Sequence, residues 1–172
     1  MMSPKFLSIT RQNIHFYFPK ILLLYIRYRK FLGDDFSKNQ FGINYIYTFI
    51  LERSPLFWVI LADESYAGFI YLDELIGSKD YIHCAELTVC LDKKFWGQFT
   101  RKVADEFISL CFENLNLHKL KACIYPENNR VRSILNYCGF EKEGFFKSET
   151  IKNAIPQDVE IYGLLNKNIN CK

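Results

Sequence analysis

The feature of the sequence that most constrains the fold is the stretch 84–140, in which a strand, a turn and a helix occur twice in succession. An apolar strand at 85–91 leads through a charged turn into an amphipathic helix at about 100–115, where apolar residues recur at helical spacing. A second strand at 119–125 precedes a short helix that ends at Gly139. Strands joined by such a helix run parallel, with a right-handed crossover. The stretch therefore predicts an α/β domain.

The segments on either side of this stretch extend the same sheet. Apolar runs predict further strands at 5–10, 57–61, 66–72, 140–150 and 158–166, helices at 13–31 and 38–53, and loops at 76–80 and 152–157. The first helix is expected to be deeply packed, because apolar residues crowd all its sides near 21–26, and to kink or restart at Pro19. We expect one domain over residues 1–172, with a mixed central sheet of about six to seven strands flanked by helices.

Composition argues against several classes of function. A chain of 172 residues with 49% apolar content suits one folded domain, and a net charge of +3 without a basic stripe argues against nucleic-acid binding. The apolar run at 21–26 is too short to cross a membrane, which takes about 20 residues, and it lies too deep in the chain for a signal peptide. The six cysteines show no paired spacing, which indicates a reduced, cytoplasmic setting. The three histidines show no metal-ligand spacing, so no metal site is expected.

A glycine lies where the first strand of this stretch meets its helix, in the turn Trp96-Gly97-Gln98. The free N–H groups in the first turn of a helix, together with the positive end of the helix dipole, bind phosphate groups. The turn therefore predicts that a phosphate-bearing cofactor binds at residues 94–100. The alternative is that Gly97 only permits a tight turn and that Trp96 belongs to the core.

The order of these elements and four motifs resemble the GNAT acyltransferases, above all the branch that acetylates ribosomal-protein N-termini. The motifs are Trp96-Gly97-Gln98, Leu117-His118-Lys119-Leu120-Lys121-Ala122, Pro126-Glu127-Asn128, and Gly139-Phe140 followed by Glu143-Gly144. The resemblance covers about residues 55–166. It implies the single-domain GNAT fold and an N-acyltransferase that carries an acetyl group from acetyl-CoA to a primary amine by direct attack. The implied acceptor is a protein N-terminus or a small molecule, and a homodimer stays open.

The resemblance assigns the phosphates of the cofactor to the loop that begins at Lys94. In the family this loop reads Arg or Gln, two free positions, Gly, one free position, then Gly or Ala. Here Lys94 opens the loop, Gly97 keeps the glycine, and Phe99 replaces the small residue that lies against the pyrophosphate. The residues implied to bind the cofactor are Lys94, Trp96, Gly97, Gln98, Phe99 and Thr100.

The resemblance also places the pantetheine arm of the cofactor along the end of the strand 85–91. The residues implied there are Thr88, Val89, Cys90 and Leu91, with the N–H of Val89 as the oxyanion donor. Glu86 lies earlier on this strand, where several family members keep a carboxylate that takes a proton from the amine. That step is needed because amines are mostly protonated at neutral pH. The alternative for Glu86 is a structural hydrogen bond or ion pair, and Glu143 and Glu149 are weaker candidates for the base.

Asn128 opens the short helix, where asparagine is a natural N-cap, and the matching family residue also contacts the pantetheine arm. Val131 replaces a common serine, and Leu135 replaces a tyrosine that often gives a proton to the departing thiolate, while Tyr137 lies on a different face. Together with Phe99, these departures leave a second hypothesis open, a catalytically silent binding or assembly module. An outward Phe99 would favour the enzyme, and a ring that fills the phosphate site would favour the silent module.

Overall fold

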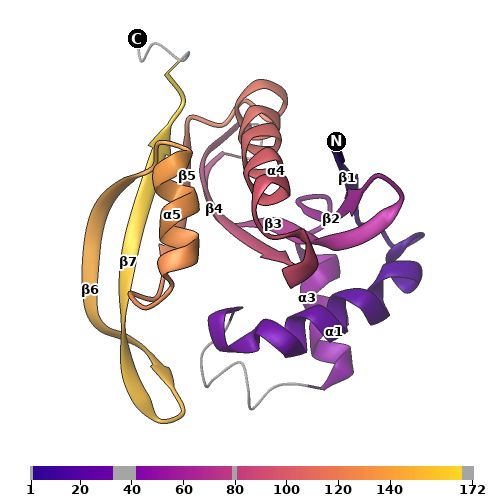
Figure 1. Ribbon diagram of the computed structural model, residues 1–172, viewed down its shortest axis with the longest axis horizontal. Helices are drawn as coiled ribbons and strands as arrows, with labels where there is room; N and C mark the ends of the chain where they lie inside the picture. The colour runs from indigo at the N-terminus through magenta and orange to yellow at the C-terminus, as the bar shows by residue number, and fades with distance from the viewer. Residues whose placement is uncertain (1, 33–41, 79–80, 168–172) are drawn as a thin grey trace.

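The computed structural model describes residues 2–32, 42–78 and 81–167, and within them seven strands form one sheet in the order β1-β2-β3-β4-β5-β7-β6 (Figure 1). The strands are β1 Pro4–Ser8, β2 Phe57–Ala62, β3 Ser65–Ser78, β4 Tyr81–Leu91, β5 Lys119–Ile124, β6 Glu141–Lys152 and β7 Ile155–Leu165. The helices are α1 Ile14–Leu32, α3 Ile43–Glu52, the 3-10 turn Lys93–Phe95, α4 Gln98–Ser109 with a π-helical turn Leu110–Asn114, and α5 Asn129–Tyr137. The expected α/β fold with a mixed sheet is confirmed.

The pairing of β4 with β5 is the parallel contact that the crossover through α4 predicts. It covers only Cys84, Ala85 and Glu86 on β4, opposite residues 119–121 on β5. The other strand pairs described are antiparallel. In Figure 1 the sheet accordingly opens into two halves, with β1 to β4 on one side and β5, β7 and β6 on the other.

Strand β2 lies between two hydrophobic cores. All six of its residues are buried, because alternate side chains point to opposite faces of the sheet and each face is covered. Phe57, Val59 and Leu61 pack in the core formed with α1 and α3. The residues between them, such as Trp58 and Ile60, pack in the core formed with α4. Helices therefore cover both faces of this half of the sheet (Figure 1).

The prediction that α1 is packed on all sides is wrong. Its buried face consists of Ile14, Ile21, Leu24 and Tyr25, whereas Leu23 is 67% exposed. The sheet covers only one side of the helix, so the apolar residues on the other side remain at the surface. The helix is continuous from Ile14 to Leu32, so Pro19 does not restart it. None of the described helices is long and apolar enough to cross a membrane.

The prediction of a loop at 152–157 is wrong. This polar segment is the tip of a hairpin. Strand β6 runs to Lys152 and β7 begins at Ile155, so only Asn153 and Ala154 form the turn. Both have positive φ, of 53° and 59°, which is the backbone that a two-residue hairpin turn requires. Strand β3 likewise extends through most of the expected loop at 76–80, of which 79–80 lie outside the described residues, as do 38–41 of the second expected helix.

Candidate active site

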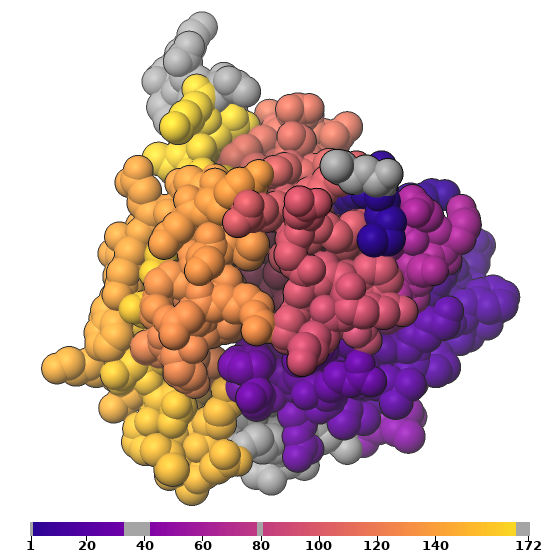
Figure 2. Space-filling view, in the orientation of Figure 1, coloured from indigo at the N-terminus to yellow at the C-terminus, as the bar shows by residue number. Residues whose placement is uncertain are grey.

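The separation of β4 and β5 opens a cleft in the middle of the sheet. Beyond Glu86 the strands no longer pair, and a cavity of about 1110 Å³ lies between them. Its walls come from the second half of β4, the end of β5, the first turns of α4, and α5. The last turns of α1 line a further side. Figure 2 shows the hollow between α4, in pink, and α5, in orange.

The direction of the backbone groups of β4 follows from two hydrogen bonds at its ends. The carbonyl of His83 accepts from the N–H of His118, on the β5 side, at 3.1 Å. The N–H of Asp92 donates to the carbonyl of Ala67, on the β3 side, at 2.9 Å. Because the backbone groups of a strand point alternately to its two neighbours, the odd-numbered residues in 83–91 face β5.

The open edge of β4 therefore presents unpaired backbone groups to the cleft. The C=O group of Leu87 and both the N–H and C=O groups of Val89 point to the side where β5 has moved away. Both residues line the cleft, and Val89 is 36% exposed. Such an edge can pair with an extended ligand as it would with another strand.

The start of α4 forms one end of the cleft. Gly97 precedes the helix with φ 105° and ψ −128°, and no side chain caps its first turn. A Cβ at Gly97 would meet nothing within 4 Å, so the space in front of the helix is open. The first N–H groups of a helix have no partner within the helix. These observations fit the expected phosphate site.

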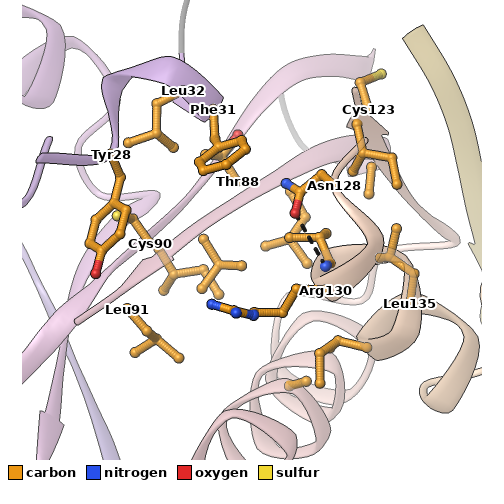
Figure 3. Close-up of a pocket in the computed structure, with 18 of the residues that line it drawn as sticks. Tyr28, Phe31, Leu32, Thr88, Cys90, Leu91, Cys123, Asn128, Arg130 and Leu135 are labelled. Atoms are coloured by element: carbon orange, nitrogen blue, oxygen red, sulfur yellow. Dashed lines mark hydrogen bonds between the residues drawn. The ribbon is translucent and has the colours of Figure 1, made fainter. Parts of the chain in front are cut away.

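Positive charge surrounds this helix start. Arg130, on α5, places its guanidinium 3.6 Å from the centre of the Trp96 ring, and Figure 3 shows its side chain reaching across the cleft from α5. Trp96 is held in place because its indole N–H donates to the carbonyl of Leu91 at 3.1 Å. A second hollow of about 670 Å³ adjoins the cleft and is lined by Gln98, Arg101 and Arg130.

Three of the expected cofactor residues point their side chains elsewhere. Phe99 is 7% exposed and packs in the core against Phe95, with ring centres 5.4 Å apart. Cys90 is 5% exposed and belongs to the core under α1 and α3, where burial raises the pKa of its thiol to about 12. Lys94 lies outside the cleft with its N–H donated to Asp92 at 3.2 Å. Cys90 still lines part of the cleft, and Phe99 keeps a backbone N–H in the uncapped first turn of α4.

The remaining expected residues have structural partners as well. The Thr100 hydroxyl donates to the carbonyl of Phe95 at 3.2 Å, Thr88 is hydrogen-bonded to Tyr71, and the side chain of Asn128 accepts from the N–H of Val131 at 3.4 Å. Asn128 is thus the N-cap of α5. Like Thr88, Thr100 and Leu91, it also lines the cleft.

Glu86 lies at the other end of the cleft from α4, at the last paired position of β4. Its Oε2 accepts a hydrogen bond from the thiol of Cys123, on β5, at 3.2 Å. The two weaker candidates are not at the cleft. Glu143 forms an ion pair with Lys119 at 2.6 Å, and Glu149 is exposed on β6.

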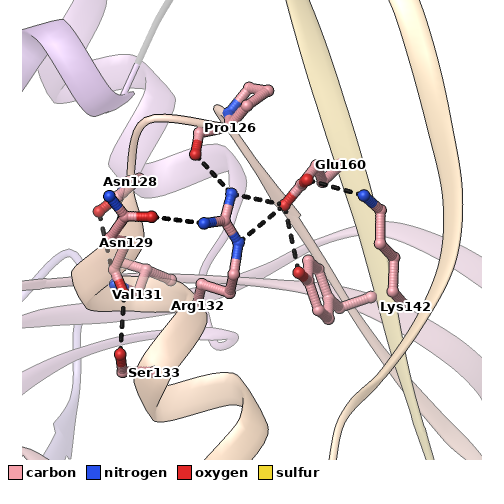
Figure 4. A network of polar contacts seen from close by, with 9 residues as sticks. Pro126, Asn128, Asn129, Val131, Arg132, Ser133, Lys142 and Glu160 are labelled. Carbon is pink, nitrogen blue, oxygen red and sulfur yellow. Dashed lines mark hydrogen bonds and ion pairs between the residues drawn. The ribbon is translucent and has the colours of Figure 1, made fainter.

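A polar network fixes the start of α5, where Asn128 and Arg130 lie (Figure 4). Arg132 donates to Glu160 at 3.1 and 3.0 Å and to the carbonyl of Pro126. Lys142 donates to the other oxygen of Glu160 at 2.7 Å. The hydrogen bond from Lys142 is the largest cause that lowers the pKa of Glu160, and Arg132 adds to it against the effect of burial. The network fastens α5 to β7.

Sequence reasoning missed Arg130, Cys123 and the Arg132–Glu160 pair. The alternation of buried and exposed positions on β5 would have placed Cys123 on one face, but nothing local shows its partner. Among the described residues no group of His, Cys, Asp and Glu is arranged to hold a metal ion.

Comparisons with known proteins agree with this geometry. The model of an acetyltransferase (GNAT) domain matches residues 27–141, more than half of the chain. The chain is 30% identical over 84 residues to the uncharacterized N-acetyltransferase p20 of Bacillus licheniformis, which covers 48% of this chain and 47% of that protein. It is also 30% identical over 112 residues to the spermidine N(1)-acetyltransferase of Vibrio cholerae, covering 63% of this chain and 62% of that protein. The chain thus matches less than two thirds of the length of either relative.

A solved structure matches over nearly the whole chain. It is that of the ribosomal-protein alpha-N-acetyltransferase RimL in complex with coenzyme A, with a TM-score of 0.78 over 95% of this chain and 94% of that chain. At 13% sequence identity, this match shows a shared fold.

Proposed function

The chain belongs to the GNAT acetyltransferase family, and on that premise we propose that it transfers an acetyl group from acetyl-CoA to a primary amine. Acetyl-CoA, the acetyl donor of the family, supplies an acetyl group activated as a thioester. One observation carries the proposal. The open edge of β4 leads from a carboxylate, Glu86, to the uncapped start of α4 at Gly97.

The two ends of the cleft suit the two ends of such a donor. The N–H groups at the start of α4 and the guanidinium of Arg130 would hold its phosphates. The edge of β4 would pair with its extended arm, and the five steps from Glu86 to Leu91 extend about 17 Å at about 3.3 Å per residue. Phe99 presents no obstacle, because its ring lies in the core. A Phe99 ring that filled the phosphate site would have favoured the silent module, and the ring does not lie there.

Glu86 and Val89 have the chemical roles in this proposal. A carboxylate can take the proton that an ammonium group must lose before its nitrogen can attack. The N–H of Val89 points into the cleft and can stabilise negative charge that develops on the acetyl oxygen. Holding both reactants in one cleft supplies much of the remaining rate.

The acceptor end of the cleft is acidic. Glu86, Asp73 and Glu74 all line the cleft, and Asp73 is the residue of β3 opposite Glu86. Arg53 neutralises Asp73 through a hydrogen bond of 2.9 Å, which leaves the charges of Glu74 and Glu86 to attract a cationic amine. Relatives named for spermidine and for ribosomal-protein N-termini make both of these amine classes the first to test.

The direct test is acetyl transfer measured by chromatography and mass spectrometry. The panel should contain spermidine, a peptide with a free N-terminus and the same peptide with an acetylated N-terminus. We expect product from at least one free amine and none from the blocked peptide. Glu86→Gln should lower kcat by about 10²–10⁴-fold. Glu143→Gln, which removes a carboxylate outside the cleft, should leave kcat unchanged.

Under this proposal the protein works in a reducing compartment such as the cytoplasm, and it needs no nucleic acid. The five cysteines among the described residues are all free thiols, which supports that setting.

A homodimer through the exposed apolar face of α1, which includes Phe16 and Leu23, is part of the proposal. Light scattering after gel filtration would test it, and a monomer at micromolar concentration would refute it.

A further inference from the structure

A thiol holds the carboxylate at the acceptor end of the cleft. The pairing of β4 and β5 ends with Glu86 opposite Lys121. Cys123 lies two residues further along β5 and therefore on the same face of the sheet as Lys121. Its Sγ donates to Oε2 of Glu86 at 3.2 Å. The contact thus joins the two strands where they begin to separate.

The direction of this hydrogen bond is set by the protonation of the thiol. Partial burial of the thiol between the two strands, followed by the negative charge of Glu86, raises the pKa of Cys123 to about 12. The thiol is therefore protonated near neutral pH and acts as a donor, while the carboxylate accepts. Among the described residues the structure gives no hydrogen-bond partner to Oε1 of Glu86. One carboxylate oxygen is thus fixed and the other is left to meet a ligand.

We propose that Cys123 is a positioning residue, which orients the carboxylate of Glu86 toward the amine through the hydrogen bond between β5 and β4. The inference rests on the proposed function and deepens it, because a second side chain, Cys123, then fixes the orientation of the carboxylate that acts as the base. Cys84, Cys90 and Cys111 are buried, while Cys123 is exposed at the cleft. The cleft thereby carries a thiol that reagents can reach.

The kinetic test compares Cys123→Ala with Cys123→Ser. Loss of one hydrogen bond to a charged group should lower kcat about tenfold in the alanine variant, with an unchanged KM for acetyl-CoA. Serine keeps a donor at the same position and should restore most of kcat. A purely structural role would instead lower the melting temperature of both variants and leave kcat alike in the folded protein. Equal kcat in the wild type and the alanine variant would overturn the proposal.

A second measurement tests the contact without any turnover. The rate at which iodoacetamide alkylates Cys123 is measured by peptide mass spectrometry in the wild type, in Glu86→Gln and in the control Glu127→Gln. Removing the charge of Glu86 should accelerate alkylation, about tenfold for each unit by which the pKa of the thiol falls. The control lacks a contact with Cys123 and should match the wild type. Equal rates in all three proteins would overturn the proposal.

The two measurements separate the inference from its premise. A wild-type protein that acetylates no amine would refute the proposed function and the positioning role together. Faster alkylation in Glu86→Gln would then still show that the contact itself exists in solution. Acetyl transfer that Cys123→Ala leaves unimpaired would refute the positioning role alone.

Discussion

Replacing Gly97 with valine separates the stability of the fold from the binding of the cofactor. Gly97 has φ 105° and ψ −128°, a conformation that residues with a side chain rarely adopt. The added Cβ would meet no protein atom within 4 Å. The cost to the fold is therefore backbone strain without a steric clash, and the new methyl groups would occupy the open space before α4.

The expected loss of stability follows from the strain alone. A residue held in such a region costs about 1–3 kcal/mol. For a domain of this size, about 1 kcal/mol shifts the melting temperature by about 2–4 °C. We therefore expect the melting temperature of Gly97→Val to fall by about 2–12 °C, with a cooperative transition retained.

The expected loss of affinity follows from the hydrogen bonds to the phosphates. Phosphate oxygens would receive hydrogen bonds from the first N–H groups of α4, and a hydrogen bond to a charged group is worth about 1.5–3 kcal/mol. Losing one of them weakens binding about 10- to 100-fold. Calorimetric titration with acetyl-CoA measures this loss in the folded variant.

A matched control is Gly42→Val, because Gly42 has φ −84° and equally open surroundings at the start of α3. It should bind acetyl-CoA as the wild type does. A Gly97→Val protein with a lowered melting temperature but an unchanged dissociation constant would refute the reasoning, since Gly97 would then serve only the turn.

Three further variants test other parts of the account. Phe99→Ala should lower the free energy of unfolding by about 3–5 kcal/mol, because the ring is buried; a small loss in urea unfolding would place the ring elsewhere. Arg130→Ala should weaken acetyl-CoA binding about tenfold with an unchanged melting temperature, because its guanidinium is exposed and lies over the face of Trp96; unchanged affinity in calorimetry would exclude it from the site. The pKa of Glu160 is lowered in the folded protein, so its ionised carboxylate stabilises the fold at pH values above the pKa of an unfolded glutamate, about 4.3. This stabilisation is lost as the pH falls through the lowered pKa of the folded state. Glu160→Gln should therefore be less stable than the wild type at pH 7, and the difference should shrink in acid below about pH 4; a constant difference in urea unfolding would contradict this.

The sequence predicted the stretch 84–140 well because its order depends on local patterns. Val103 and Phe107 recur four residues apart on α4, and the structure buries both. Phe99 lies one turn earlier on the same face, so the helical period alone places its ring in the core. The family pattern compares only the size of the residue at position 99, so it did not reveal that the side chain of Phe99 points into the core.

Other features depend on contacts that no local pattern encodes. The separation of β4 and β5 after Glu86 is a property of the two strands together, although it creates the cleft. The stacking of Arg130 on Trp96 and the contact of Cys123 with Glu86 each join residues more than 30 positions apart. The exposed face of α1 was missed because its apolar residues point in all directions, and only the packing shows which of them the sheet covers.

Hydrogen–deuterium exchange with and without saturating acetyl-CoA tests the central claim most directly, because it reports where on the chain the ligand binds. The account predicts slower exchange in two segments, 87–91 on the open edge of β4 and 97–101 at the start of α4. These segments contain the N–H groups of Val89 and Leu91, which face the side that β5 leaves open, and those of the uncapped first turn of α4. Protection confined to other segments, or no protection at all, would contradict the assignment of the cleft as the site of acetyl transfer.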